Sequence, residues 1–168
     1  MVMNQSPVFY YSSFDTPLGL FSVAVDDGGA LIAAAFGGFE DLGGRADLDG
    51  ATRDEDRTAA ARGQLLDYFR GGRRSFSLKT APEGSAFQHR VWKALGEIPY
   101  GQSRSYGDIA RQIGSSPRAV GRANATNPVC LVVPCHRVIG ADGSLTGYAF
   151  GEDIKRRLLA HEGAGAAR

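Results

Sequence analysis

Two cysteines lie five residues apart in the segment NPVCLVVPCHRVIG, residues 127–140. Cys130 sits inside an apolar run, as is typical of a buried structural cysteine. Cys135 is instead followed directly by His136 and Arg137. A neighbouring base or positive charge favours the thiolate, which is the reactive form of cysteine. Cys135 at the rim of the core is therefore a candidate nucleophile, with a buried filler as the alternative.

His136 is the nearest candidate base for Cys135. Adjacent residues rarely face one another in an extended chain, so we expect a bridging water rather than direct contact between the two side chains. A base also needs an acid to orient it, and the carboxyl-terminal half of the chain has few. Glu162, near the end of EDIKRRLLAHEG, is one candidate. With three histidines and neither a CxxC nor an HExxH motif, no metal site is expected.

Two short helices are predicted ahead of this segment, at 105–113 and 117–126. Ser105 begins a capping-box pattern for the first helix, and Gly114 is a typical C-terminal residue. Ser116, followed by proline at the first helical position, opens the second helix. Helices of this length joined by a Gly-Ser-Ser turn have the dimensions of a helix-turn-helix.

The second of these helices has little side-chain bulk. Ala119 and Gly121 are small, whereas Arg118 and Arg122 share one face because they are four residues apart. A thin helix with a basic edge can approach a phosphate backbone or a narrow groove, or it can simply pack tightly on a neighbouring helix. After it, the β-branched run 129–133 is predicted to be a buried extended segment that ends at a proline.

The amino-terminal half has a different pattern. Short β-prone runs separated by turn signals predict an antiparallel meander, followed by a loop rich in glycine and aspartate and then a helix. The predicted runs are 8–14, 18–26 and 29–36, the loop is 36–56 and the helix is 57–71. A connection over 71–84 follows, and Ser85 then caps the next predicted helix, 86–95. An α+β fold with a boundary near residue 80 follows from this change of pattern.

Composition and charge exclude several classes of protein. Hydrophobic residues make up 43% and charged residues 22%, which is ordinary for a globular protein, and no apolar run approaches the roughly 18 residues of a membrane span. The first residues do not resemble a secretory signal, and two cysteines do not make a disulfide framework, so a cytoplasmic location is expected.

The net charge of +1 conceals an asymmetry. Residues 1–80 carry 8 basic and 11 acidic side chains, whereas residues 81–168 carry 11 basic and 7 acidic ones. Within 98–137, five arginines accompany the single acid Asp108. This segment can face a polyanion such as nucleic acid, or it can be an ordinary solvated surface that happens to be basic.

The segment RAVGRANATNPVCLVVPCHRVIG, residues 118–140, resembles the O6-alkylguanine-DNA alkyltransferase family. The resemblance extends over 87–110 and 143–163, and residues 14–31 resemble the amino-terminal domain of bacterial members. It implies a small antiparallel-sheet domain with a helix, over 1–80 with the connecting loop. It also implies a helical, winged-helix-like domain over 81–168, which binds DNA through a helix-turn-helix and carries the active site.

The resemblance implies DNA repair by direct damage reversal. An alkyl group on O6 of guanine, or on O4 of thymine, would move irreversibly to Cys135 after the base is flipped out of the duplex. Because water does not readily displace a thiolate from an unactivated alkyl group, the thioether is permanent, the protein reacts once, and no cofactor is needed.

Each implied role falls on a numbered residue of this chain. The implied catalytic residues are Cys135 as the nucleophile and His136 as the base that acts on it through water. Glu162 is the acid that polarises this base, and Asn127 is the asparagine that braces the active-site turn. The implied DNA-binding residues are Tyr106, Arg118, Ala119, Gly121 and Arg122. The implied substrate-binding residues are Tyr106, Val138, Tyr148, Ala149 and Lys155.

The expected partner is double-stranded DNA carrying O6-alkylguanine, bound in the minor groove by a monomer, with cooperative clustering on DNA also open. Three rival functions remain at this point. One is a DNA-binding sensor of alkyl damage that has no transfer chemistry. A second is a cysteine hydrolase using Cys135, with His136 or His161 and Glu162. The third is a non-catalytic transcription regulator.

Overall fold

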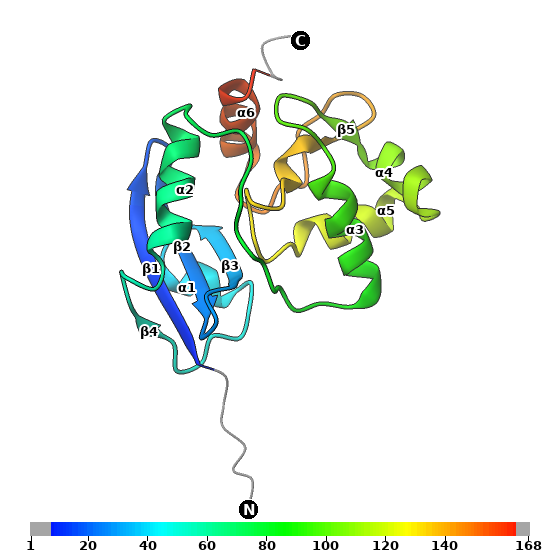
Figure 1. Cartoon of the computed structure of the whole chain (residues 1–168). Helices are drawn as coiled ribbons and strands as arrows, with labels where there is room; N and C mark the ends of the chain where they lie inside the picture. The colour runs from blue at the N-terminus through cyan, green and yellow to red at the C-terminus, as the bar shows by residue number, and fades with distance from the viewer. Residues whose placement is uncertain (1–7, 164–168) are drawn as a thin grey trace, which may run out of the picture.

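The computed structural model describes residues 8–163, so most of the amino-terminal stretch considered for a secretory signal lies outside the described residues. The predicted meander is confirmed. Strands β1 (Phe9–Thr16), β2 (Gly19–Asp26) and β3 (Leu31–Phe36) pair in antiparallel order, and β4 (Thr52–Arg53) adds in parallel to the outer edge of β1 (Figure 1).

Helices cover both faces of this sheet, which is why β3 is buried along its whole length. On one face, α2 (Ala59–Phe69) packs Leu65 and Phe69 against Phe21 and Val23. On the other face, Leu42 of α1 (Phe39–Gly43) packs with small and branched residues: Ala24, Ile32, Ala33, Ala35 and Leu48. The prediction of a loop over 36–56 is therefore wrong in part, because the glycine-rich composition conceals the short helix α1 and the strand β4.

The carboxyl-terminal half is helical, as predicted. Its helices are α3 (Ala86–Gly96), α4 (Tyr106–Ile113), α5 (Pro117–Ala125) and α6 (Glu152–His161). The predicted caps are confirmed: the side chains of Ser85, Ser105 and Ser116 accept hydrogen bonds from the third backbone amide of α3, α4 and α5. Gly114 ends α4 with φ of 71°, a left-handed conformation that suits glycine.

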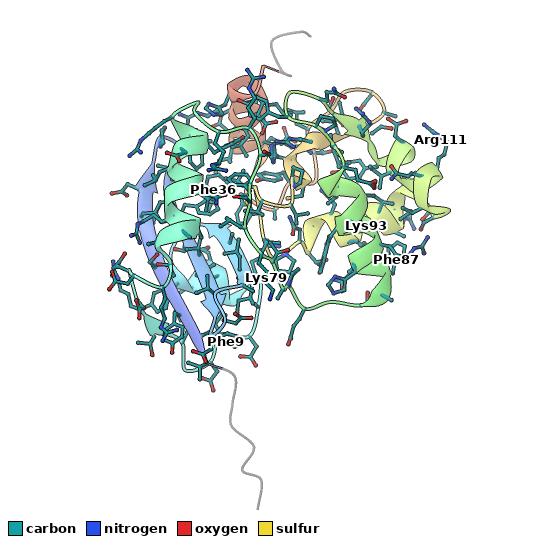
Figure 2. The ribbon with its side chains drawn as sticks, viewed as in Figure 1. Phe9, Phe36, Lys79, Phe87, Lys93 and Arg111 are labelled. Atoms are coloured by element: carbon teal, nitrogen blue, oxygen red, sulfur yellow. The ribbon has the colours of Figure 1, made fainter. Side chains whose placement is uncertain are left out.

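The helix-turn-helix consists of α4 and α5, separated by residues 114–116. Beside it, β5 (Arg104–Ser105) and β6 (Val138–Ile139) form a short parallel pair. Arg111 projects outward from α4 at the edge of the molecule, whereas Phe36 of β3 points into the interior (Figure 2).

The prediction that residues 129–133 form an extended segment is wrong. Val129 forms a bridge with Ala34 of β3, and the chain then turns, so that Cys130 is bridged to Val133. Leu131 lies within this turn with φ of 73°, a conformation that non-glycine residues rarely adopt. The β-branched composition correctly indicates burial, but it does not reveal the turn.

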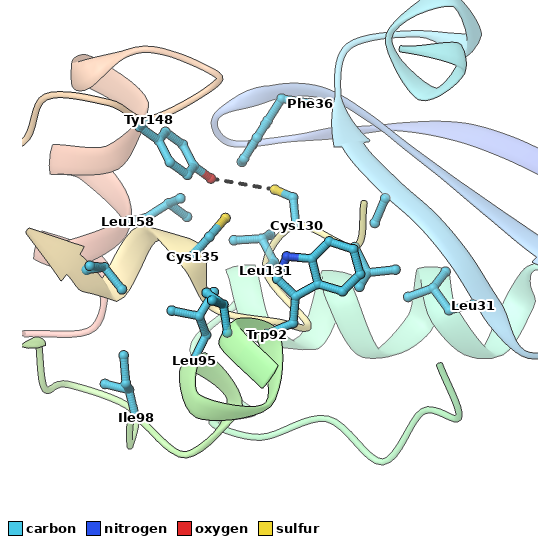
Figure 3. Close-up of a cluster of buried hydrophobic side chains, with 14 of the residues drawn as sticks. Leu31, Phe36, Trp92, Leu95, Ile98, Cys130, Leu131, Cys135, Tyr148 and Leu158 are labelled. Atoms are coloured by element: carbon cyan, nitrogen blue, oxygen red, sulfur yellow. Dashed lines mark hydrogen bonds between the residues drawn. The ribbon is translucent and has the colours of Figure 1, made fainter. Parts of the chain in front are cut away.

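One hydrophobic cluster joins the sheet to the helices. It includes Phe21 and Leu65 from the first half of the chain, and Trp92, Cys130 and Cys135 from the second. Figure 3 shows both cysteine sulfur atoms directed toward the Tyr148 hydroxyl within this cluster. None of the helices among residues 8–163 is long and apolar enough to cross a membrane.

Candidate active site

Cys135 begins a single 3₁₀ turn, η1 (Cys135–Arg137), directly after a proline. Its side chain belongs to the hydrophobic cluster, and the residue is only 4% exposed. The sequence predicts the candidate nucleophile at the rim of the core. This prediction is wrong, because the residue is buried. It can react only with a group that enters the protein.

The charges around Cys135 come from residues distant in sequence. Burial raises the pKa of the Cys135 thiol, while a hydrogen bond from Asn127 and the positive charges of Lys155 and Arg45 oppose that rise. Its sequence neighbours His136 and Arg137 point toward another partner. The expectation that Arg137 favours the thiolate therefore needs correction, whereas the water-mediated role of His136 stays a prediction.

That partner is Glu162, at the carboxyl end of α6. His136 Nε2 lies 2.8 Å from Glu162 Oε2, and Arg137 donates from Nε and Nη2 to the two carboxylate oxygens at 2.8 and 3.1 Å. The Tyr68 hydroxyl donates to Oε2 at 2.6 Å. The carboxylate is fully buried and accepts hydrogen bonds from three side chains, so Glu162 does not merely end the helix.

This arrangement fixes the protonation state of the histidine. Despite burial, hydrogen bonds from His136, Arg137 and Tyr68 hold the pKa of Glu162 far below its usual range. An ionised Glu162 makes His136 Nε2 the protonated ring atom, since that nitrogen must donate. Burial also lowers the pKa of His136, which keeps the ring neutral. Nδ1 is left as a basic atom, buried and without a hydrogen-bond partner among the described residues.

Two asparagines hold the backbone around the cysteine. Asn127 donates to the Val133 carbonyl at 2.9 Å and accepts from the Val129 amide at 3.1 Å, which closes the turn before Cys135. Asn124 of α5 donates to the Cys135 carbonyl at 3.3 Å. The helix-turn-helix and the candidate nucleophile are thus connected directly through a buried side chain.

A buried ammonium group lies between two tyrosines near Cys135. Lys155 Nζ lies 5.7 Å from the ring centre of Tyr106 and 5.9 Å from that of Tyr148, with no hydrogen-bond partner among residues 8–163. Burial lowers the pKa of Lys155 to about 8. The Tyr148 hydroxyl contacts the Cys130 sulfur at 3.5 Å, so Cys130 lines the same region without being exposed.

A surface hollow of about 570 Å³ lies beside this buried group. Tyr106 and α5 form its walls through Arg118, Gly121 and Arg122, and the loop 146–147 closes the opposite side. The Tyr106 hydroxyl donates to the Thr146 carbonyl at 3.3 Å. The structure thus places four of the five predicted DNA-binding residues, all except Ala119, around one hollow, and the predicted catalytic side chains in the core next to it.

The remaining predicted residues fall at the margins. Ala119 is half-buried on α5, Val138 is fully buried in β6, and Ala149 is exposed beside Tyr148. Phe150 packs on Phe36 of β3, with a ring-centre distance of 5.6 Å. The loop that follows the hollow is thereby fixed to the sheet.

Sequence reasoning missed Tyr68, Asn124 and the role of Arg137 as a partner of Glu162. Tyr68 looks like an ordinary core residue of a helix, and its partner is 94 positions away. Asn124 sits in a helix among small residues, where an asparagine is unusual because its helix propensity is poor. That signal alone could have marked it. Within the described part of the chain, no cluster of His, Cys, Asp and Glu could hold a metal ion.

Comparisons with known proteins agree with this geometry. Residues 86–164 match the family model described as 6-O-methylguanine DNA methyltransferase, DNA binding domain. A methylated-DNA–protein-cysteine methyltransferase of Methanosarcina acetivorans is 46% identical over 92% of this chain and 99% of its own length. A constitutive methyltransferase of the same name from Bacillus subtilis is 43% identical over 89% of this chain and 93% of its own length.

Solved structures extend the similarity to three dimensions. The crystal structure of Mycobacterium tuberculosis OGT in complex with DNA superposes with a TM-score of 0.83, at 42% identity over 93% of this chain and 94% of that one. An O6-methylguanine-DNA methyltransferase from Pyrococcus kodakaraensis gives a TM-score of 0.61 at 28% identity, over 92% and 99% of the two chains.

Proposed function

Since the chain belongs to the methylated-DNA–protein-cysteine methyltransferase family, we propose that it repairs DNA by transferring an alkyl group from O6 of guanine, or from O4 of thymine, to its own Cys135. The observation that carries this proposal is a buried cysteine beside a neutral histidine whose far nitrogen is held by an ionised carboxylate. In such a site the thiol stays protonated until a substrate enters and excludes water, and it can then lose its proton to the histidine.

The reaction balances without a cofactor. The Cys135 sulfur forms a bond to the alkyl carbon while the bond from that carbon to O6 breaks, and the electron pair stays on the guanine. His136 Nδ1 takes the thiol proton through a water, and the resulting imidazolium is stabilised by Glu162. The proton returns to the departing guanine. The thioether product does not hydrolyse, so each molecule reacts once.

The hollow beside α5 supports entry of a flipped base. We infer that α5 binds the minor groove, about 6 Å wide, because its small residues permit close approach. Arg118 would fill the gap left by the base, Arg122 would contact phosphate, and Tyr106 would crowd the phosphate and favour rotation of the base. Ala119 and Gly121 would face the groove.

Inside the pocket, Tyr148, Ala149, Lys155 and the Val138 carbonyl would surround the guanine. Asn127 would keep the turn before Cys135 in place. We further infer that 1–80 and 81–168 are the structural and DNA-binding domains, and that the protein acts in the cytoplasm as a monomer that can cluster on DNA.

The proposed function has a direct test. Duplex DNA carrying O6-methylguanine with a labelled methyl group is incubated with the protein, and label on protein is counted against moles of protein. We expect one label per molecule, located on Cys135 by peptide mass spectrometry. Tight binding to the damaged duplex without transfer of label would instead identify a damage sensor, and repeated turnover would exclude both functions.

The relay predicts a specific pH dependence for Glu162→Gln. Loss of the carboxylate charge destabilises the imidazolium, so the pKa of Cys135 should rise and the rate with free O6-alkylguanine should fall by about tenfold or more at neutral pH. The rate should partly recover in alkali, where the thiol ionises unaided. A pH–rate profile measures this shift.

Stability provides a second readout for the same variant. Glu162→Gln leaves the buried Arg137 without its counter-ion, which should cost about 3 kcal/mol and lower the melting temperature. Asp153→Asn, which removes an exposed carboxylate from the same helix, is the control for both measurements. An unshifted profile with a raised melting temperature would refute the relay.

Lys155 should support the thiolate only while it is charged. Because its pKa is about 8, Lys155→Met should slow the reaction with free O6-alkylguanine below pH 8, by about tenfold, and have progressively less effect above that pH. The variant should also melt at a higher temperature, since an ammonium buried without a hydrogen bond is costly. The neighbouring exposed Arg156→Met is the control. A rate ratio that stays constant with pH would contradict this role.

A further inference from the structure

The amino-terminal half of the chain contributes one side chain, Tyr68, to the hydrogen bonds around Glu162. Tyr68 lies near the end of α2, is 1% exposed, and reaches Glu162 across the hydrophobic cluster. Its hydroxyl donates to Oε2 at 2.6 Å, the same oxygen that accepts from His136 Nε2 at 2.8 Å. The phenol and the imidazole therefore share one acceptor atom.

We propose that Tyr68 is a positioning residue that acts through Glu162 and sets how strongly this carboxylate attracts the His136 proton. The proposal rests on the proposed alkyl transfer. A hydrogen bond donated to a carboxylate spreads its charge and lowers its affinity for other protons. With Tyr68 and Arg137 both donating, Glu162 stays ionised and leaves the proton on His136.

The surroundings of Tyr68 suit a permanent donor. Burial and the Glu162 charge raise the pKa of the Tyr68 phenol well above its usual range, so it stays protonated. The Tyr68 ring packs against the rings of Tyr100, Phe76 and His161, at ring-centre distances of 6.2, 5.7 and 5.0 Å. His161 also contacts the Tyr68 carbonyl at 2.7 Å, so both ends of the residue are fixed to α6 or its neighbours.

The carboxylate does not depend on Tyr68 for its position. Arg137 holds both of its oxygens, and the Gly101 amide donates to Oε1 at 3.4 Å. The charged and titratable groups that act on His136 are Glu162, Arg137 and Lys155. Removing the Tyr68 hydroxyl should therefore change the charge felt by His136 while the geometry is kept.

The sign of the expected shift follows from this arrangement. In Tyr68→Phe, Glu162 loses one donor and its negative charge is less dispersed, so the imidazolium form of His136 is favoured. Transfer of the thiol proton then becomes easier, and the apparent pKa of Cys135 should fall. The shift is opposite to that expected for Glu162→Gln.

The test is the pH–rate profile of Tyr68→Phe with free O6-benzylguanine. We expect the profile to move toward acid by about half a unit, with a lower melting temperature. Tyr100→Phe is the matched control, because it removes a neighbouring hydroxyl that donates to the His161 carbonyl at 3.4 Å and not to a carboxylate. In the Glu162→Gln background, Tyr68→Phe should cause no further shift.

Two outcomes would overturn this role. A profile shifted toward alkali would mean that Tyr68 holds Glu162 in place, and an unshifted profile with a lower melting temperature would mean that it only stabilises the fold. Wild-type protein is measured alongside with labelled DNA. If wild type transfers no label, the proposed function fails; if it transfers label while the variant shows no acid shift, only the role of Tyr68 fails.

Discussion

Replacing Cys135 with serine is expected to reduce alkyl transfer by more than about a thousandfold, because a serine hydroxyl is far less ionised and less nucleophilic than a thiol near neutral pH. Binding to duplex DNA should persist, since Cys135 is buried and the arginines of α5 lie on the surface. Transfer is measured with labelled O6-methylguanine in a duplex, and binding by a shift in electrophoretic mobility.

Cys130→Ser is the matched control for this prediction. Cys130 is completely buried five residues away and also approaches Tyr148, so the control removes a thiol from the same cluster. It should retain transfer and lose a modest amount of stability, since a hydroxyl replaces a sulfur in an apolar site. Label that survives in Cys135→Ser, or disappears in Cys130→Ser, would mean that the nucleophile has been assigned to the wrong cysteine.

Local signals made much of the fold predictable. Strand runs separated by turn residues identified β1 to β3, and three serine caps located the starts of α3, α4 and α5. The prediction failed where long-range packing overrides local preference. The run 129–133 is β-branched, yet Asn127 and the bridge from Val129 to β3 impose a turn on it.

The candidate site was predictable to the extent that its residues carry recognisable chemistry. Cys135, His136 and Glu162 were identified as a group from sequence, and the structure brings the histidine and the carboxylate within 2.8 Å. The charges that act on the thiol were not predictable from position in the chain. Arg45 and Lys155 are 90 and 20 residues from Cys135; the packing of the two halves brings Arg45 near it, and the fold of the carboxyl-terminal half brings Lys155 near it.

The arginines of α5 lie on the surface, whereas Cys135 is buried, so their role can be separated from the chemistry. Arg118 occupies the first turn of α5 and is exposed at the edge of the hollow that contains Tyr106 and Gly147. Its side chain makes no hydrogen bond or ion pair within the part of the chain that the structure describes. A free guanidinium at the edge of the hollow fits the role proposed above, in which it occupies the space of a base that has left the stack.

Arg118→Ala should therefore separate binding of DNA from chemistry. Flipping a base costs a few kcal/mol, and a side chain that fills the gap recovers part of that cost. Its loss should slow repair of duplex substrate by about 10- to 100-fold, since each 1.4 kcal/mol is a factor of ten. Reaction with free O6-alkylguanine should change by less than about twofold, because no flipping is needed there.

Arg122→Ala is the informative comparison, since it removes the same charge one turn further along α5. If Arg122 contacts only phosphate, its loss should weaken duplex binding in a salt-dependent manner and should be overcome at saturating DNA. The deficit of Arg118→Ala should remain at saturation, because base flipping follows binding. Single-turnover rates on both substrates at saturating concentrations distinguish the two arginines. Equal losses of Arg118→Ala on duplex and free base would instead assign this residue to the fold or the pocket.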